Sequence, residues 1–575
     1  MTGPLDDPAA GFGVYGLDAA PPRAELATHA VANQPPLFAG RNAFTTDPAF
    51  REAALREAGG AREWAEPALT ALGAEVGSAA VLEAGALANR HPPELATFDR
   101  TGMRLDEVRV HPSYHALMAL ATAHRIHDIA WARDAEGKSG GHVLHAGLLA
   151  LFTQAEPGVM CPISMTYASA PLIRRTPALA EAWLPKLVGG RYDPRLLPVS
   201  EKAGITIGMA MTEKQGGSDV RANETRAAPD GAGGEGAPYR LTGHKWFCSA
   251  PMSDAFFTLA HAPGGLSCFF VPRVTPDGAR NAIHLMRLKD KLGNRSNASA
   301  EIEYHGAWAL LVGEEGRGVA TIIEMVHGTR LDTIFGSLGI MRAALARAHH
   351  HVSHRRAFQK TLVDQPLMRA VIADLQIAYE AAVVLAFRIA RAVEGADPGE
   401  RAFARLAVAL GKYLLNKSCA PFVAECLECL GGSGYVEESG MPLLYREAPL
   451  NAIWEGSGNV IALDVLRTLA RSPEALDAVR AELALARGAD PRLDAAVAAL
   501  ERDLGGGRLC EASARHVAER LALALQGALL VRHAPAAVAD AFCATRLAGG
   551  PTLTYGALPG GIDAGAIVAR MTEVR

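Results

Sequence analysis

The chain has 575 residues, of which 49% are hydrophobic and 21% are charged, and these proportions exclude a disordered or fibrous protein. One hydrophobic core rarely supports this length, so we expect two to four domains, and an aromatic content of only 6% favours closely packed helices. The net charge of −4 excludes a strong overall attraction to nucleic acid, and eight cysteines in so long a chain indicate reduced thiols, not a disulfide framework.

The chain begins with an expected irregular arm over residues 1–32, followed by a predicted α-helical domain over residues 33–196. The arm is rich in Ala, Pro and Asp and lacks the basic and apolar stretches of a secretion signal, which together with the reduced thiols indicates a cytoplasmic protein. From about Asp47 to about Lys186, apolar residues recur every three or four positions, the period of a helix. No run approaches the roughly 18 apolar residues that a membrane span needs.

A β-domain is predicted over residues 197–315. Four β-rich runs, GITIGMAMT, PYRLTGHKWFCS, AFFTLAHA and LSCFFVPRV, are separated by Gly, Pro, Asp and Ser. Gly264 and Gly265 lie between the last two runs, where they favour a hairpin turn. Residues 229–238 are interpreted as a flexible surface loop.

Helical spacing returns over residues 316–471 and predicts a bundle of long helices that would also supply subunit contacts. Residues 472–575 are interpreted as a helical extension, broken at residues 505–507 and by Pro551 and Pro559. Within this extension, the apolar run Leu521–Val531 indicates a buried helix. The fold class predicted is therefore mainly α with a central β-domain.

Two segments carry the chemistry. Residues 209–221, MAMTEKQGGSDVR, follow an apolar run with a polar loop that contains glycine, which suits a site that presents N–H groups to phosphates and a flavin edge. Residues 453–459, IWEGSGN, present the carboxylate of Glu455 next to small residues that permit a close approach to a cofactor. No strand is followed by a G-x-G-x-x-G fingerprint, so a Rossmann dinucleotide fold is not predicted.

Both segments resemble motifs of the acyl-CoA dehydrogenase family, in which the first binds FAD and the second carries the catalytic glutamate. Seven segments in matching order, MTEKQGGSDV, GHKWF, GGLSCFFVP, LKDKLGNRSNAS, QPLMR, PFVAE and IWEGSGN, are most similar to its AidB-like branch of adaptive-response flavoproteins, linked to DNA-alkylation damage. The similarity runs from about Asn33 to the C-terminal region. It implies an α-helical domain, a β-barrel-like domain and an α-helical bundle, with a C-terminal helical extension.

The resemblance also assigns contacts to FAD. Those matched to the flavin ring and its pyrophosphate are Met211, Thr212, Gly217, Ser218, Phe247, Cys248 and Ser249. Those matched to the remaining contacts, which the family completes across a subunit interface, are Arg355, Phe358, Gly431, Gly432, Ser457 and Asn459. These matches imply a homotetramer. By itself, the glycine run from Gly431 is a helix-ending turn, and Gln359 stands where the family usually has Gly.

Glu455 matches the catalytic base of the family. The α-proton of an acyl thioester is only weakly acidic, so its removal needs a polarised carbonyl and a carboxylate at the α-carbon, while the β-hydride passes to the flavin. Arg330 matches an arginine that lies near the active site of relatives. His327 stands where relatives place Asn or Asp against the CoA chain, which is a departure from their CoA-binding pattern.

Two further clusters are interpreted as structural. Cys426 and Cys429 form a C-x-x-C without a second pair nearby, and they indicate two small residues on a helix face. Four histidines lie close together without a carboxylate to complete a set of metal ligands. A solvated helix face and no metal site are predicted for these four, His349, His350, His351 and His354.

Double-stranded DNA is implied as a partner by the resemblance alone. Residues 461–575 contain 13 arginines, no lysine and 13 acidic residues, which cancel, whereas non-specific DNA binding usually needs an excess of cations. Arginines suited to phosphate contacts are Arg502, Arg508, Arg515 and Arg520. Amphipathic helices with paired charges are the alternative interpretation of this region.

Three functions stay open at this point. The first is a damage-response flavoprotein that binds DNA and has a weak dehydrogenase activity of the isovaleryl-CoA type. The second is a metabolic dehydrogenase of short or branched acyl thioesters, in which Glu455 abstracts the α-proton. The third is a catalytically silent scaffold that keeps FAD for structure. Salt-sensitive binding to duplex DNA would favour the first, and rapid flavin reduction by an acyl-CoA the second.

Overall fold

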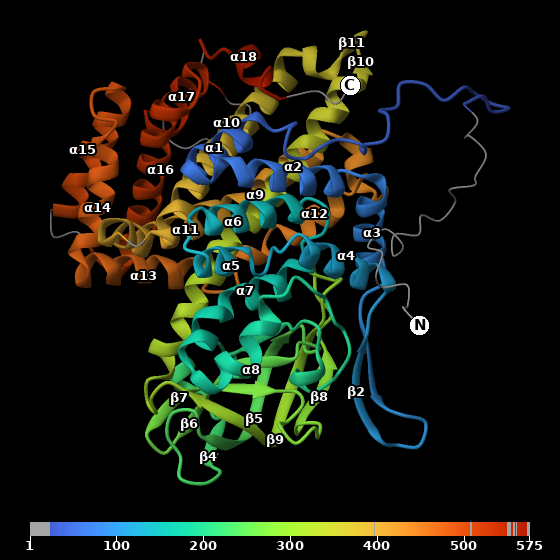
Figure 1. Cartoon of the computed structure of the whole chain (residues 1–575). Coiled ribbons are helices and arrows are strands. Elements are labelled where there is room, and N and C mark those ends of the chain that lie inside the picture. Colours follow the sequence, from blue (N-terminus) through green and yellow to red (C-terminus); the bar gives the residue numbers. More distant parts are fainter. Residues whose placement is uncertain are drawn as a thin grey trace. The chain divides into compact units, whose positions relative to one another are not determined.

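The computed structural model describes residues 24–395, 397–505, 509–548, 554–555, 558 and 561–571 (Figure 1). Contacts between Cα atoms divide these residues into two compact units. Unit 1 comprises residues 83–141 and 156–332, and unit 2 comprises residues 24–82, 142–155 and 333–571. Because each unit combines segments of several predicted domains, the predicted limits at residues 196, 315 and 471 stay predictions.

Unit 1 contains short helices and a twisted sheet. Its helices are most of α3 (Ala79–Arg90), α4 (Pro112–Ala123), α5 (Ile129–Ala135), α7 (Met160–Arg175), α8 (Pro177–Leu187) and the first part of α9 (Gly318–His354). Proline occupies the first turn of α4, where it costs no hydrogen bond, and the His111 ring accepts from the Ser113 N–H at 3.2 Å. The helical character predicted for this region is thus present.

A two-stranded hairpin interrupts these helices, and the sequence pattern did not predict it. It consists of β1 (Glu94–Phe98) and β2 (Arg104–Arg109), paired antiparallel with Glu94 opposite Arg109. Figure 1 shows it in blue. Side chains along β1 are only half-buried or exposed, so the strand lacks the alternation of apolar and polar residues that would have revealed it.

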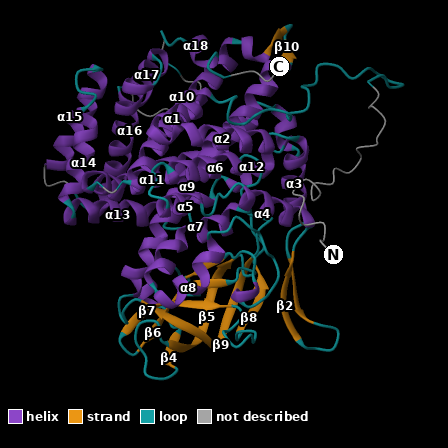
Figure 2. Cartoon of the chain, viewed as in Figure 1, coloured by secondary structure: helices purple, strands orange, loops and turns teal. Residues whose placement is uncertain are grey.

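The seven-stranded sheet of unit 1 closes into a barrel, as predicted. Its order is β3-β6-β4-β5-β9-β7, β8 pairs with β9, and β6 pairs with β7 to close the ring. Figure 2 shows these strands in orange. Their bounds are β3 (Ile207–Ala210), β4 (Arg226–Pro229), β5 (Pro238–Ser249), β6 (Ala255–Ala262), β7 (Gly265–Pro272), β8 (Ile283–Leu288) and β9 (Ser299–Val312).

Turns and aromatic side chains fix the register of the barrel. Ala262 lies opposite Gly265, so two residues form the hairpin turn, and Gly265 has a φ of +118° that favours glycine. The surface loop predicted over residues 229–238 joins β4 to β5 and is largely exposed. Tyr239 and Phe269 contact edge to face with ring centroids 5.2 Å apart in the buried interior.

Unit 2 is helical apart from a small two-stranded ribbon. Its helices are α1 (Pro48–Ala58), α2 (Arg62–Val76), α6 (Gly141–Thr153), the rest of α9, α10 (Pro366–Glu394), α11 (Pro398–Glu428), α12 (Met441–Glu447), α13 (Gly458–Arg471), α14 (Pro473–Ala484), α15 (Pro491–Gly505), α16 (Ala514–His533), α17 (Ala536–Phe542) and α18 (Ala564–Val568). The ribbon pairs β10 (Arg356–Ala357) with β11 (Lys360–Thr361).

Helix α10 lies at the centre of unit 2 and packs on α1, α11, α16 and α18. It begins with Pro366, and Asp397 caps α11 by accepting from the Gly399 and Glu400 N–H groups. Among the described helices, α10 is long and apolar enough to cross a membrane, and a second span arises only if residues 48–90 are counted as one bent helix. Asp374 and Glu380 interrupt α10, so it is no unbroken apolar run, and 83% of its most apolar window is buried inside the protein.

The C-terminal extension is joined to α10 by buried charges. Glu482 of α14 accepts from Arg388 of α10 at 2.9 Å and from Arg532 of α16 at 2.6 Å. Arg388 also donates to Glu400 of α11 at 2.8 Å. The run Leu521–Val531 lies in α16 and is mostly buried, which confirms a buried helix there. The predicted helix breaks at residues 506–507, 551 and 559 lie outside the described residues.

Candidate functional site

In unit 1, the loop that follows β3 brings Thr212 and Gly217 together. A Cβ atom added to Gly217 would lie 2.4 Å from Thr212 Oγ1, so a larger residue would not fit at this turn. The Trp246 N–H donates to the Thr212 carbonyl at 2.8 Å and ties the loop to β5. Gly217 and Ser218 are exposed, which leaves their N–H and hydroxyl groups accessible to a ligand.

A buried ion pair between Glu213 of this loop and Lys245 of β5 fixes the loop to the barrel. Lys245 Nζ donates to Glu213 Oε1 at 2.7 Å and to the Leu259 carbonyl at 2.7 Å, and both charged side chains are fully buried. Burial lowers the pKa of Lys245 to about 8, against the attraction of Glu213. Burial opposes ionisation of Glu213, but Lys245 and the N–H groups of Glu224 and Thr225 outweigh it and lower its pKa.

A β-bulge turns two aromatic side chains of β5 toward the surface. Lys245 pairs with Ile302 and Cys248 with Ala300, so β5 has one extra residue between them. As a result, Phe247 is 48% exposed and Trp246 is half-buried, whereas Cys248 is buried. Burial also raises the pKa of Cys248 to about 12, which leaves the thiol protonated.

Cations surround the bulge. Lys289 Nζ lies 3.2 Å from the centroid of the Trp246 ring, and Lys214 and Arg287 lie within 5.8 Å and 5.7 Å of it. Lys289 and Arg287 share Glu301 as a partner, which neutralises part of their charge. Partly exposed aromatic side chains edged by cations suit a negatively charged ligand with an aromatic part.

Other predicted residues of unit 1 lie close in sequence to these elements. Ser249 Oγ is 3.5 Å from Ser299 Oγ on the neighbouring strand β9. Met211 is half-buried, and its carbonyl accepts from Asn223 Nδ2 at 3.1 Å. Arg330 is buried within α9, where it makes contacts, so it is held in place and not free in solvent.

In unit 2, Glu455 has an unusual backbone conformation. Its φ is +58°, in the left-handed region that a non-glycine residue rarely adopts, and Gly456 follows with a φ of +106°. The positive φ of Gly456 favours glycine, and a Cβ atom there would lie 2.9 Å from Ile461 Cδ1, so the isoleucine side chain would have to shift. Strain of this kind, maintained by its surroundings, is typical of functional sites.

Buried polar side chains of α11 hold the Glu455 loop through hydrogen bonds to its backbone. Lys412 Nζ donates to the Asn451 and Trp454 carbonyls at 2.9 and 2.8 Å, and Asn416 Nδ2 donates to the Asn451 carbonyl at 3.0 Å. The Trp454 ring N–H donates to Asn451 Oδ1 at 2.9 Å. The loop therefore presents Glu455 from a fixed backbone immediately before α13, with Ser457 and Asn459 exposed at the start of that helix.

The predicted contact Phe358 lies at the tip of the ribbon β10–β11, and the predicted contact Arg355 lies directly before β10. Phe358 and Gln359 have φ values of +48° and +66°, so the tight turn forms although Gln359 replaces the glycine expected there. Phe358 is 94% exposed. Arg355 donates to the Asn33 carbonyl at 2.6 Å, and Asn33 pairs with the backbone of Arg356.

The predicted glycine turn after α11 is also exposed. Gly431 has a φ of +59°, and added Cβ atoms on Gly431 and Gly432 would meet no atom within 4 Å. Gly434 differs, because its Cβ would lie 2.2 Å from the Leu427 carbonyl oxygen. The turn thus ends α11, and the first two glycines leave their backbone open to a ligand.

Comparison with known proteins identifies the family. The chain is 45% identical to AidB of Escherichia coli (strain K12) over 524 residues, which cover 90% of this chain and 94% of the relative. The chain belongs to the acyl-CoA dehydrogenase family. Residues 33–194 match the adaptive response protein AidB N-terminal domain, 208–307 the acyl-CoA dehydrogenase middle domain, and 316–470 the acyl-CoA dehydrogenase C-terminal domain.

Other members of the acyl-CoA dehydrogenase family extend this result. The chain is 31% identical to the Caenorhabditis elegans acyl-CoA dehydrogenase family member 11, over 78% of this chain and 77% of that one. It matches the structure of C. elegans ACDH-11 in complex with C11-CoA at 26% identity and a TM-score of 0.80, over 98% of this chain and 96% of that one. The chain is therefore an oxidoreductase of the type that acts on CH–CH groups.

The structure contradicts the prediction for the histidine cluster and agrees with the prediction for the two cysteines. Histidines 349 and 351 are only 6% and 8% exposed, so the prediction of a solvated helix face was wrong for them. Residues that precede α1 pack against this part of α9, as the hydrogen bond between His350 and the Pro36 carbonyl shows. Cys426 and Cys429 are buried at the end of α11, as small residues on a helix face. Within the described residues, no group of three or more His, Cys, Asp and Glu could hold a metal ion.

Sequence reasoning proposed site residues in each loop but missed the residues that hold the loops in place. Contiguous motifs supplied Thr212 and Gly217 in one loop and Glu455 in another. Their anchors, Lys245 and Lys412, lie far away in sequence. Lys412 stands within an apolar run and Lys245 directly before two aromatic residues, and a cation next to apolar residues signals a buried partner, because an unpaired buried charge is very costly.

Proposed function

We propose that this acyl-CoA dehydrogenase binds FAD and removes an α-proton and a β-hydride from an acyl-CoA thioester, with Glu455 as the base. The observation that carries the proposal is the left-handed backbone of Glu455 in a loop held by Lys412 and Asn416, because strain maintained by its surroundings is typical of functional sites. The family implies FAD, and the C. elegans relative whose structure contains C11-CoA supports a thioester substrate.

Unit 1 has the features that FAD needs. The small-residue turn at Gly217, the exposed Ser218 hydroxyl and the aromatic bulge next to Lys289 provide phosphate donors and a flat surface. Met211, Thr212, Phe247, Cys248 and Ser249 complete the proposed contacts of this unit. FAD, when bound, would accept the hydride from the β-carbon.

Glu455 would receive the α-proton. A carboxylate on a mobile loop would sample many positions, whereas the hydrogen bonds from Lys412 and Asn416 to the loop carbonyls preset this one. Arg330 is proposed to orient the site from α9, where it is buried. Short and branched thioesters such as isovaleryl-CoA are the proposed substrate class, which the family resemblance suggests.

A homotetramer is part of the proposal. Large apolar side chains are exposed on unit 2 near the predicted cross-subunit contacts, with exposed fractions of 94% for Phe358, 85% for Leu367 and 83% for Tyr435. Isolated apolar residues are common on surfaces, but three so exposed favour coverage by another subunit. Arg355, Gly431, Gly432, Ser457 and Asn459 are the polar contacts that we propose for FAD bound by a neighbouring subunit.

The test is an anaerobic titration of the yellow protein with a panel of acyl-CoAs that includes isovaleryl-CoA, followed by flavin absorbance. Rapid stoichiometric bleaching by one thioester is expected. Glu455→Gln should keep its FAD but not bleach, whereas the exposed control Glu438→Gln should bleach normally. Retained bleaching in Glu455→Gln would exclude it as the base. If every thioester bleached the flavin only over hours, the remaining candidate functions would be a catalytically silent scaffold and a damage-response role.

Protection of DNA against alkylation is the second candidate, favoured by the 45% identity to AidB over 90% of the chain. Arg502 is exposed in the extension and suits a phosphate contact, and Arg508 lies outside the described residues. Most neighbouring arginines are already engaged: Arg480 pairs with Glu501, Arg492 with Asp540, and Arg515 donates to Tyr413. Fluorescence anisotropy with duplex DNA would decide, since wild-type binding that Arg502→Gln and Arg520→Gln leave unchanged would exclude these contacts.

A further inference from the structure

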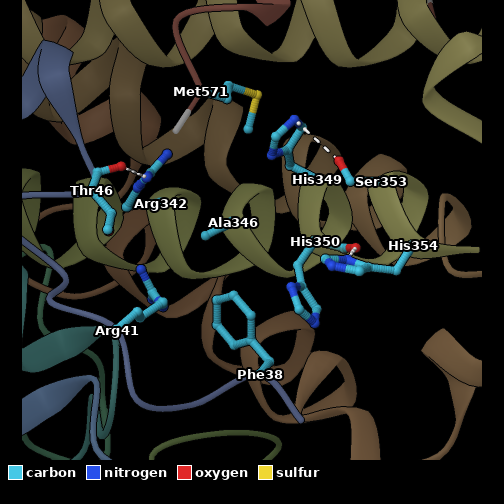
Figure 3. A pocket seen from close by; sticks show the side chains of 10 residues that line it. All are labelled: Phe38, Arg41, Thr46, Arg342, Ala346, His349, His350, Ser353, His354 and Met571. Carbon is cyan, nitrogen blue, oxygen red and sulfur yellow. Dashed lines mark hydrogen bonds between the residues drawn. The ribbon is translucent and has the colours of Figure 1, made fainter. Parts of the chain in front are cut away.

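A small hollow in unit 2 gathers arginine and histidine side chains. Helix α9 contributes Arg342, Ala346 and His349 to its lining, and the segment before α1 contributes Phe38 and Arg41 (Figure 3). Neither the proposed FAD contacts nor Glu455 lines it. Ala346 is the smallest of these side chains, and it leaves open the space between the cationic groups in Figure 3.

Arg41 is the informative residue. Its side chain is 6% exposed, and its hydrogen bond to another side chain goes to the neutral Gln154 Oε1 at 3.3 Å. The buried Nε of Arg41 has no hydrogen-bond partner among the described residues. Its guanidinium lies 4.4 Å from the centroid of the Phe38 ring, on which a second arginine, Arg347, also packs at 5.1 Å.

Among the described residues, little negative charge is available to this cluster. Asp47 is the carboxylate that acts on Arg41, but it pairs with Arg342 at 3.0 Å and also accepts from the Tyr379 hydroxyl at 2.6 Å. Burial first, and then repulsion by Arg342 and Arg347, lower the pKa of Arg41 to about 9. A buried cation without a counter-charge of its own is strongly destabilising, and no described residue supplies one to Arg41 alone, so an additional anion is the simplest account.

Neutral donors extend the hollow along α9. Ser353 Oγ lies 3.4 Å from His349 Nε2, and His354 Nδ1 is 2.8 Å from the His350 carbonyl. Hydroxyl and imidazole groups beside guanidinium groups are a donor set for an oxyanion.

We propose that this hollow binds an oxyanion of the phosphate class, with Arg41 and Arg342 as its charged donors and Ser353 at its rim. Guanidinium groups match the geometry of a phosphate with two parallel hydrogen bonds and remain weakly hydrated when buried. The bound anion would supply the charge that Asp47 alone does not.

Calorimetric titration of the FAD-loaded protein with inorganic phosphate, in a buffer free of other oxyanions, tests the proposal. Wild type should bind one phosphate per subunit, and its melting temperature should rise saturably with phosphate. Arg41→Met should weaken binding by roughly ten- to a hundredfold, because a charge-assisted hydrogen bond is lost. Arg480→Met removes an exposed arginine from the same unit and should bind phosphate like wild type.

Ala346→Leu provides a second variant in case Arg41→Met does not fold. It keeps every charge but fills the hollow, so it should also abolish the phosphate response. An equal response to sodium chloride at the same ionic strength would overturn the proposal, as would wild-type binding in both variants. If Arg41→Met lost both its FAD and its response to phosphate, the arginine would belong to the flavin site, and the proposal would also be overturned.

Discussion

Glu213 and Lys245 show how single residues position the proposed flavin loop. Both are fully buried, so each charge is tolerated only because the other is present. We predict that Glu213→Gln lowers the free energy of unfolding by about 3–5 kcal/mol, since Lys245 then stays buried without its counter-charge. The double variant Glu213→Gln with Lys245→Met should lose less free energy of unfolding than the sum of the losses in the two single variants. Urea unfolding and bound FAD are the measurements.

The exposed pair between Arg240 and Asp230 in the same unit provides the control for this experiment. Its side chains are 52% and 41% exposed, so Asp230→Asn should change stability by about 0–1 kcal/mol. Equal losses in Glu213→Gln and Asp230→Asn would show that the buried pair does not anchor the loop.

His349 gives the protein a pH-dependent stability. Burial first, and then the positive charge of Arg342, lower its pKa to about 4, while an unfolded histidine titrates near 6.5. The unfolded chain therefore binds the proton more readily, and the stability from neutral His349 is fully present above about pH 6.5 and lost as the pH falls to about 4. In His349→Gln, the decrease in the free energy of unfolding between these pH values should be smaller than in wild type, by up to about 3 kcal/mol.

Denaturant unfolding between about pH 7.5 and 4, in a buffer without phosphate, measures the effect. The exposed His305 is the control, and His305→Gln should keep the wild-type slope. A wild-type slope in His349→Gln as well would show that its burial does not set the acid limit of stability.

At the scale of elements, the β10–β11 turn forms in spite of its sequence. Gln359 occupies a left-handed conformation that costs a side chain about 1 kcal/mol or more relative to glycine. We therefore predict that Gln359→Gly raises the free energy of unfolding by roughly 0.5–1 kcal/mol. Lys360→Gly, in the adjacent strand, should instead lower it. A loss of stability in Gln359→Gly would mean that its side chain makes contacts that outweigh the strain.

Local patterns predicted the elements that local physics determines. Helices α10 and α11 and strands β5, β6 and β7 were all expected from periodicity, and the barrel-like closure came from the family resemblance. The hairpin β1–β2 was missed because its half-buried strands lack alternation. Burial of His349 was missed because distant residues near Pro36 cover that face of α9, and no spacing within α9 reveals this.

The candidate site divides in the same way. Glu455 and Gly456 are neighbours in the chain, so their motif is visible in the sequence. The partners of Glu213 and of the Glu455 loop are 32 and about 40 residues away, and only the fold shows which cation reaches which loop.

For the molecule as a whole, the contact between Glu482 and two arginines joins the helical extension to the bundle. We predict that Glu482→Gln lowers the free energy of unfolding by about 3–5 kcal/mol, because Arg388 stays buried with one partner fewer. Hydrogen exchange should rise first in α14 and α16. Glu501→Gln breaks an exposed pair with Arg480 in the same extension and should have little effect. Unchanged hydrogen exchange in Glu482→Gln would show that other contacts join the extension to the bundle.

The distribution of the eight cysteines has a practical consequence. Seven are buried, and Cys510 in the extension is exposed. A thiol reagent should therefore modify one site per folded chain, at Cys510, and the remaining seven only as structure opens. Three of the buried thiols belong to unit 1 (Cys161, Cys248 and Cys268), and the other four belong to unit 2. Mass spectrometry of the alkylated peptides would thus measure the rate at which each unit opens, without any substitution in the protein.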